Sequence, residues 1–192
     1  MLLIRHGETP WNAAGRWQGH ADPGLTEAGR EQAQAVARAL AAEAQRPWAY
    51  IVASDLARAQ ETATAIASAL RLTIVSDPRL RELDVGSWSG LTRGEIEERD
   101  PEMLRAFESG EPTIRPGGGE SRIEIRERVL EFARDLAERR SGESVIVVTH
   151  LGVIRALVPG AEPTNASRIE VVAEEISARG VDRGRRREDG AL

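Results

Sequence analysis

Two apolar segments, far apart in the chain, each end in a histidine, and this pairing restricts the fold more than any other feature. Residues 2–4 lead into Arg5 and His6, and residues 144–149, rich in β-branched side chains, lead into His150. Short continuous apolar segments of this kind are typical of buried strands in a parallel sheet. In open α/β sheets, ligands bind beyond the carboxyl ends of the strands. We therefore expect both histidines at one edge of one sheet, facing a ligand.

The residues at the first strand end are suited to binding an anion. Arg5 offers a planar set of donors that fits phosphate or carboxylate, and His6 offers a nitrogen nucleophile near neutral pH. We expect Gly7 to let the backbone approach a ligand closely, because it has no Cβ. Taken alone, His6 could belong to an ordinary surface turn. The second histidine, placed in the same way, favours a functional site.

Helical patterns alternate with the predicted strands. Thr26 is suited to cap a helix, and residues 50–53 and 72–75 predict further strands, separated by a helix from Ser54 to about Leu70. A helix between successive strands is typical of parallel βαβ units. Arg58 falls in the first turn of the second helix, where the helix dipole disfavours a cation. We interpret Arg58 as a residue that faces a bound anion.

Four segments of the chain, in order, resemble the motifs of the histidine phosphatase superfamily, the phosphoglycerate-mutase-like fold. They are Arg5-His6-Gly7-Glu8-Thr9 with Asn12, Ser54-Asp55-Leu56-Ala57-Arg58-Ala59 with Thr62, Leu80-Arg81-Glu82-Leu83 with Gly86, Trp88 and Gly90, and Val148-Thr149-His150 with Gly152. The resemblance implies an α/β fold with three α/β/α layers and a mostly parallel central sheet. It also implies a small helical lid, inserted at about residues 91–120.

The resemblance assigns roles to particular residues. His6 would be the nucleophile and Glu82 the proton donor, and only the resemblance selects Glu82 over its charged neighbours. The catalytic set that it implies is His6, Glu82, His150, Arg5 and Arg58. The phosphate- and substrate-binding set is Arg5, Asn12, Gln18, Gly19, Arg58, His150 and Leu151. A bound phosphate dianion would raise the pKa of His150 and keep it protonated. No metal ion and no cofactor are expected.

Composition limits the partners that the chain could have. The net charge is 26 − 31 = −5, so no general polyanion-binding surface is implied, and nucleic acid is not an expected partner. Every basic residue is an arginine, so an individual arginine indicates little unless its position is informative. The first predicted strand leaves no room for a signal peptide, and no apolar segment is long enough to span a membrane. We expect a cytoplasmic protein that acts on a small phosphomonoester; a homodimer stays open.

Several further segments have structural interpretations. Ser121 and Glu124 fit a capping box for a helix over residues 122–140, and the preceding glycines, Gly117–Gly119, favour a structural role over phosphate binding. Residues 80–88 predict an extended segment, and residues 169–172 predict an edge strand. Residues 1–176 are expected to form one domain, and residues 177–192 a frayed charged tail. His20 has no assigned role, and Glu120 is left open as a residue at the pocket edge.

The sequence favours a phosphatase over two alternatives. The first alternative is a cofactor-dependent phosphoglycerate mutase, which begins with the same phosphohistidine but must exclude water. The predicted lid is net acidic and the interval between Glu82 and His150 is short, whereas the mutases of this family have longer, more basic lids. The second alternative is a catalytically silent module that binds phosphate. The presence of His6, Arg58, Glu82 and His150 counts against it.

Overall fold

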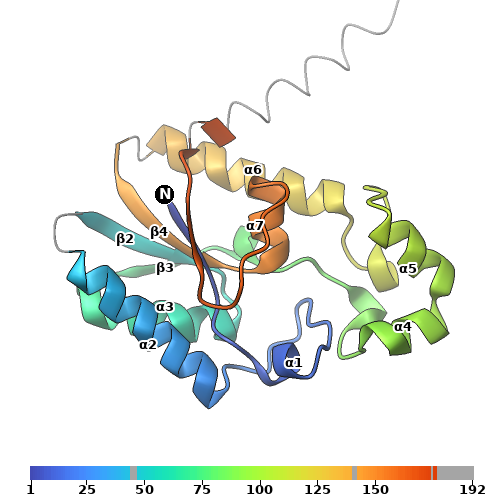
Figure 1. Cartoon of the computed structure of the whole chain (residues 1–192). Coiled ribbons are helices and arrows are strands. Elements are labelled where there is room, and N and C mark those ends of the chain that lie inside the picture. The colour runs from blue at the N-terminus through green and yellow to red at the C-terminus, as the bar shows by residue number, and fades with distance from the viewer. Residues whose placement is uncertain (44–46, 140–141, 174, 177–192) are drawn as a thin grey trace, which may run out of the picture.

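A mixed, mostly parallel sheet forms the centre of the protein in the computed structural model, which describes residues 1–43, 47–139, 142–173 and 175–176. Its strands are β1 (Leu2–Arg5), β2 (Trp48–Ala53), β3 (Ile74–Ser76), β4 (Ser144–Thr149) and β5 (Arg168–Glu170), in the order β3-β2-β4-β1-β5. The first four strands pair in parallel, and β5 pairs antiparallel with β1 at the edge. The predicted α/β class and the predicted edge strand are confirmed (Figure 1).

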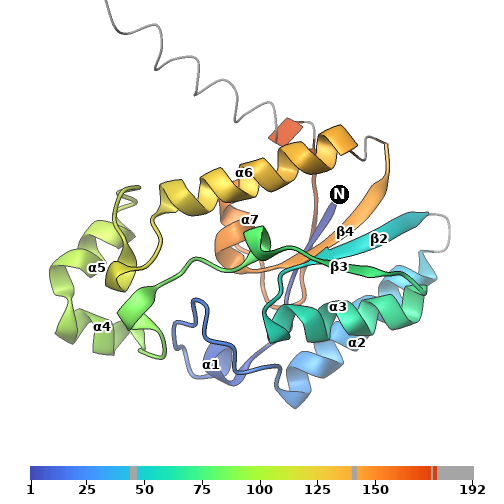
Figure 2. The same cartoon turned by 180° about the vertical axis from the view of Figure 1, so that it is seen from behind.

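Helices cover both faces of this sheet. On one face lie α2 (Glu27–Ala42) and α3 (Ala57–Leu70), and on the other lie α6 (Arg122–Arg139) and α7 (Leu151–Leu157) (Figures 1 and 2). The shorter helices α1 (Pro10–Ala13), α4 (Arg93–Arg99) and α5 (Pro101–Glu108) lie to one side. The three-layer arrangement and the helical insertion between residues 91 and 120 therefore agree with the sequence.

The two central strands are buried on both faces because their side chains alternate between two cores. Leu3 and Val147 pack with the α6 and α7 side, whereas Ile4 and Ile146 pack with the α2 and α3 side, and all four are completely buried. Such strands can contain apolar residues at every position. This is why the two apolar segments could be recognised in the sequence.

Capping residues set the starts of two long helices where the sequence predicted them. The Thr26 hydroxyl accepts a hydrogen bond from the Gly29 N–H at 2.9 Å, at the start of α2. At the start of α6, the Ser121 N–H donates to the Glu124 carboxylate at 2.9 Å, and the Glu124 N–H donates to the Ser121 hydroxyl at 3.3 Å. The capping box is confirmed, although the predicted end of the helix at residue 140 lies outside the described residues.

The prediction of an extended segment over residues 80–88 is wrong. Two 3₁₀ turns, Pro78–Leu80 and Gly86–Trp88, flank a short loop there, and a third turn, Pro116–Gly118, packs against it. A Cβ at Gly86, which has φ +50°, would collide with the carbonyl oxygen of Gly117. A tight backbone contact is present here instead of a strand, and the glycine-rich segment is structural, as the sequence favoured.

Smaller differences concern element boundaries. Helix α3 begins at Ala57 rather than at Ser54, and β3 begins at Ile74, two residues later than predicted. No helix within the described ranges is both long and apolar enough to cross a membrane. The predicted charged tail, residues 177–192, lies outside the described residues.

Candidate active site

The register of β1 and β4 brings the two histidines side by side. Arg5 pairs with Thr149, so His6 and His150 are the next residues on adjacent parallel strands, and the His6 N–H donates to the Thr149 carbonyl at 3.0 Å. Their ring centroids are 5.1 Å apart, and both side chains are at most 1% exposed. The expectation that both histidines lie at one edge of the sheet is confirmed.

A backbone hydrogen bond orients the His6 ring. Its Nδ1 lies 2.7 Å from the Gly7 carbonyl oxygen, which can only accept, so Nδ1 carries the proton. In the neutral ring, the lone pair is then on Nε2, the nitrogen that can act as a nucleophile. Burial lowers the pKa of His6 well below 6.5, and the positive charge of Arg58 lowers it further. His6 is therefore neutral near pH 7, as a nucleophile must be.

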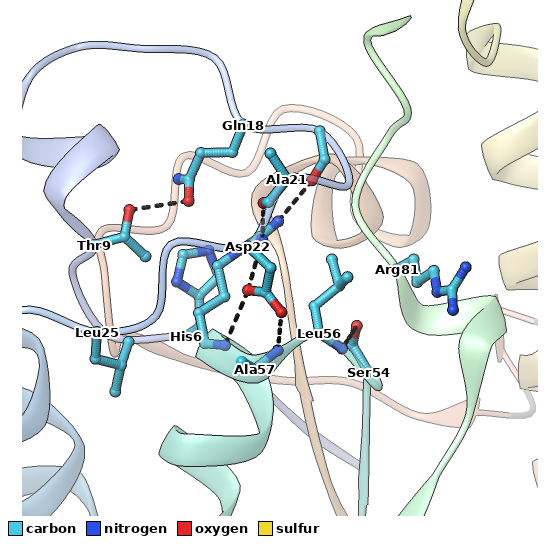
Figure 3. Close-up of polar contacts among 12 residues, drawn as sticks. His6, Thr9, Gln18, Ala21, Asp22, Leu25, Ser54, Leu56, Ala57 and Arg81 are labelled. Carbon is cyan, nitrogen blue, oxygen red and sulfur yellow. Dashed lines mark hydrogen bonds and ion pairs between the residues drawn. The ribbon is translucent and has the colours of Figure 1, made fainter. Parts of the chain in front are cut away.

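Arg58 lies in the first turn of α3, as predicted, but its negative partner is part of the chain. The Arg58 guanidinium donates to the carbonyls of Ala21 and Gly19 at 2.7 and 2.8 Å, and to the Asp22 carboxylate at 3.2 Å. The same carboxylate accepts from the backbone N–H groups of Ala57 and Arg58 and so caps α3 (Figure 3). Asp22 is a functional-site residue that the sequence did not reveal, because this cap comes from a distant loop.

Helix α1 and the loop after it contribute amide groups to the same pocket. The Thr9 hydroxyl donates to the Gln18 side-chain oxygen at 2.9 Å (Figure 3). The Asn12 side-chain oxygen accepts from the Thr9 N–H at 3.2 Å and from the Asn165 side chain at 3.1 Å. With both oxygens occupied, the amide nitrogens of Asn12 and Gln18 are left as donors. Gly19 lies beside them with φ +52°, a conformation that favours glycine.

Glu82 is fixed by backbone groups from two segments. Its Oε1 accepts hydrogen bonds from the Leu83 N–H at 2.8 Å and from the Gly152 N–H at 2.9 Å. A Cβ at Gly152 would collide with this oxygen, so glycine is required there for Glu82 to keep its place. His6, which follows β1, and Glu82, from the loop after Pro78–Leu80, thus line the same cavity.

The backbone of Glu82 is held from outside the pocket. Arg128 donates to the Glu82 carbonyl at 3.0 Å and to the Arg79 carbonyl at 2.6 Å, and the Glu120 carboxylate holds Arg128 at 2.7 Å. The His20 ring donates from Nε2 to the Glu82 carbonyl at 2.9 Å. Glu120, left open as a pocket-edge residue, therefore binds Arg128 and does not line the pocket.

One cavity of about 680 Å³ lies over this edge of the sheet. Of the predicted site residues, the following line it: Arg5, His6, Asn12, Gln18, Gly19, Arg58, Glu82 and Leu151. His150 does not line the cavity; it lies against His6 and is completely buried. Gly7 does not line it either, because its backbone packs against Gly29 of α2, where a Cβ would collide. The prediction that Gly7 approaches a ligand is therefore wrong.

Several buried nitrogens around His6 have no hydrogen-bond partner within the described part of the chain. They are Nε of Arg5, Nε of Arg58 and both ring nitrogens of His150. Leaving buried polar groups unpaired costs about 1–3 kcal/mol each, so such groups indicate a site built for something else. Three cationic or potentially cationic side chains around one nucleophile are suited to an anion with several oxygen atoms. Among the residues that the structure describes, no group of three or more His, Asp or Glu side chains could hold a metal ion.

The buried position of His150 determines when its ring can carry a charge. Burial lowers the pKa of His150 well below 6.5, and the positive charges of Arg58, Arg128 and Arg5 lower it further. The ring is therefore neutral near pH 7 in this structure. Its protonation requires an opposite charge beside it, which a phosphate dianion can supply. The sequence did not show how deeply the two histidines are buried.

These two buried histidines predict a steep loss of stability in mild acid. Because their pKa values are lower in the folded than in the unfolded protein, the native state is fully stable above about pH 6.5 and loses stability as the pH falls below it. With two extra protons bound by the unfolded chain, the free energy of unfolding should fall by up to about 2.7 kcal/mol per pH unit. Urea unfolding between about pH 7.5 and 5.5 measures this slope.

Matched variants separate the histidines from other groups that titrate in this range. His150→Gln should remove up to about half of the slope, since one of the two protons is lost. His20→Gln measures in the same way what the exposed third histidine contributes to the slope. A wild-type slope that does not respond to His150→Gln would contradict the assignment.

Comparisons with known proteins agree with this geometry. Residues 1–187 match the family described as the histidine phosphatase superfamily (branch 1). The chain is 40% identical to phosphoglycerate mutase-like protein 4 of Arabidopsis thaliana over 174 residues. This alignment covers 90% of this chain and 74% of that protein. It is 44% identical over 159 residues to the metal-independent phosphoserine phosphatase of the same plant, covering 82% and 66% of the two chains.

A solved structure of mycobacterial glucosyl-3-phosphoglycerate phosphatase with VO3 superposes with a TM-score of 0.79, at 32% identity and 88% coverage of both chains. The family match spans nearly the whole sequence, and its members share the fold described above. The chain belongs to the histidine phosphatase superfamily.

Proposed function

We propose that the protein hydrolyses small phosphomonoesters, without a metal ion, through a phosphohistidine formed on His6. The observation that supports this most strongly is the set of unpartnered buried nitrogens of Arg5, Arg58 and His150 beside a neutral histidine. A phosphoryl group places charge on its equatorial oxygens in the transition state, and preorganised cationic donors stabilise that charge.

The reaction has two steps. In the first, Nε2 of His6 attacks phosphorus, the bond from phosphorus to the ester oxygen breaks, and Glu82 gives its proton to the departing oxygen. In the second, the Glu82 carboxylate takes a proton from a water molecule, which attacks phosphorus and breaks the bond to Nε2. Inorganic phosphate leaves, and His6 and Glu82 return to their starting forms. Arg5, Arg58 and the amides of Asn12 and Gln18 bind the phosphoryl oxygens in both steps.

His150 would act through its charge. It lies behind His6, and a phosphate dianion would favour its protonated form. Leu151 and Gly19 complete the wall of the pocket. Residues 1–176 would act as one catalytic domain. The cytoplasmic location and the homodimer stay predictions.

Phosphate release from a substrate panel tests the proposal. The panel contains p-nitrophenyl phosphate, phosphoserine, glucosyl-3-phosphoglycerate and 3-phosphoglycerate, the last with and without 2,3-bisphosphoglycerate, all in the presence of a chelator. The names of the relatives suggest two of these substrates. Release of free phosphate from several of them is expected, with no loss of rate on chelation. Conversion of 3- to 2-phosphoglycerate with little free phosphate would identify a mutase. Binding of phosphate without turnover would identify a silent module.

A further inference from the structure

The active-site cavity extends well beyond the groups that would hold a phosphate. At about 680 Å³ it falls in the range of about 300–1,000 Å³ typical of pockets for whole small molecules, and a phosphoryl group occupies only a small part of this volume. Arg122 and Arg126 of α6 and Arg155 of α7 also line it. The spacing of four residues puts Arg122 and Arg126 on one face of α6, and α7 packs against this helix.

The lining of the cavity carries more positive than negative side chains. Among the described residues that line the cavity, Glu82 is the only acidic one, against Arg5, Arg16, Arg58, Arg122, Arg126 and Arg155. Arg16 is paired with Glu95 at 2.9 Å. Arg5 and Arg58 belong to the phosphate end. The remaining three arginines therefore form a separate cationic group, here called the distal arginines.

The distal arginines make few strong interactions with the described residues. Arg122 donates to the Phe107 carbonyl at 3.0 Å and lies over the Phe107 ring at 4.3 Å, and both partners are uncharged. Arg126 makes no hydrogen bond or ion pair with any residue that the structure describes. Arg155 pairs with Glu162, whose side chain is 72% exposed, so this pair is open to water. Exposed pairs of this kind contribute little stability and can exchange partners.

Two of the distal arginines, Arg122 and Arg155, are close enough for one charge to affect the other. Burial is the main reason why the pKa of Arg122 is lowered, and the charge of Arg155 lowers it further. The pKa of Arg5 is lowered in the same way, first by burial and then by charges that include Arg155. Arg155 is thus within electrostatic reach of both the phosphate end and Arg122. An anionic group bound among these arginines would relieve this repulsion.

We propose that Arg122, Arg126 and Arg155 bind a second oxyanion of the substrate, a carboxylate or a second phosphate, while its phosphomonoester lies at His6. This inference rests on the proposed hydrolase and names its substrate class: phosphomonoesters that carry another negative group. The planar guanidinium groups suit either oxyanion, because both accept pairs of parallel hydrogen bonds. Phe107 fixes Arg122 by stacking, so less side-chain entropy is lost when the anion binds.

Matched substrates test the proposal. 3-Phosphoglycerate differs from glycerol 3-phosphate by the carboxylate, and fructose 1,6-bisphosphate differs from fructose 6-phosphate by the second phosphate. In at least one pair, we expect kcat/KM to be about tenfold or more higher for the compound that carries the second negative group. The pair with the larger preference shows whether the second group is a carboxylate or a phosphate.

Matched variants connect this preference to the arginines. In the Arg122→Gln, Arg126→Gln double variant, the ratio of the two kcat/KM values within the preferred substrate pair should fall towards unity. Arg134→Gln, on the same helix but outside the cavity, should keep the wild-type ratio. Thermal unfolding confirms that each variant is folded. Equal kcat/KM within both pairs in the wild type, or an unchanged ratio in the folded double variant, would overturn the subsite.

A binding experiment separates this inference from the proposed reaction. Calorimetric titration of the His6→Ala protein with the same four compounds gives Kd ratios that do not depend on turnover. A preference that the two arginine substitutions remove supports the subsite even if the wild type releases no phosphate. If glycerol 3-phosphate is hydrolysed but neither ratio differs from unity, the hydrolase stands and the subsite is wrong.

Discussion

The His6→Ala variant is expected to lose at least ~10⁴-fold of kcat on p-nitrophenyl phosphate, because the substitution removes the atom that forms the covalent intermediate. The cations of the pocket would remain, so phosphate binding should weaken far less than turnover. The wild type is mixed with radiolabelled substrate and quenched in base, because a phosphohistidine is stable in base and is hydrolysed in acid. The labelled protein should be found with the wild type and not with His6→Ala.

A matched control uses the third histidine. His20→Ala changes an exposed ring that donates a hydrogen bond to the backbone carbonyl of Glu82, and it should keep the labelled intermediate. Turnover that survives the His6 substitution, or label that persists without His6, would move the nucleophile elsewhere in the pocket.

Glu82→Gln should affect substrates according to how much their leaving groups need a proton. An alkyl phosphate must receive a proton as its oxygen departs, so its phosphoryl transfer should slow by about 10²–10⁴-fold. p-Nitrophenolate is stable without that proton, so the first burst of nitrophenolate should keep most of its rate. The steady state should then fall because no carboxylate activates water in the second step. Stopped-flow measurement of burst and steady state separates the two effects.

Glutamine is the suitable replacement because of the local hydrogen bonds. The side-chain amide oxygen can accept from the Leu83 and Gly152 N–H groups as the carboxyl oxygen does, so the position of the group is kept. An equal loss on both leaving groups would show that Glu82 shapes the pocket instead of transferring a proton.

The sequence was most informative where a single segment determines its own structure. The apolar segments of β1 and β4 and the capping box of Ser121 and Glu124 are local patterns, and the structure contains them as predicted. The two histidines could be placed together because parallel strands end at the same edge. The family resemblance then supplied Glu82, which no local pattern distinguishes from its neighbours.

The sequence was least informative where distant segments meet. Asp22 caps α3 from a loop before α2, so the start of α3 could not be read from Ser54 and Asp55. Gly7 packs against Gly29 instead of a ligand, and a glycine in the sequence does not show which neighbour needs its space. The distal arginines could not be selected from the sequence, because all the basic residues of the chain are arginines. Only their common position on the cavity wall sets them apart.

The strand order has a consequence for how the protein comes to be active during synthesis. Strand β4 lies between β1 and β2, so the segments that carry His6 and Arg58 have no direct strand pairing with each other. Residues 144–149 leave the ribosome long after both. Contacts between segments so distant in sequence form slowly, and until they form, the edges of β1 and β2 that pair with β4 are unpaired. The pocket around His6 therefore cannot form until residues 144–149 have been synthesised and have paired with both of these strands.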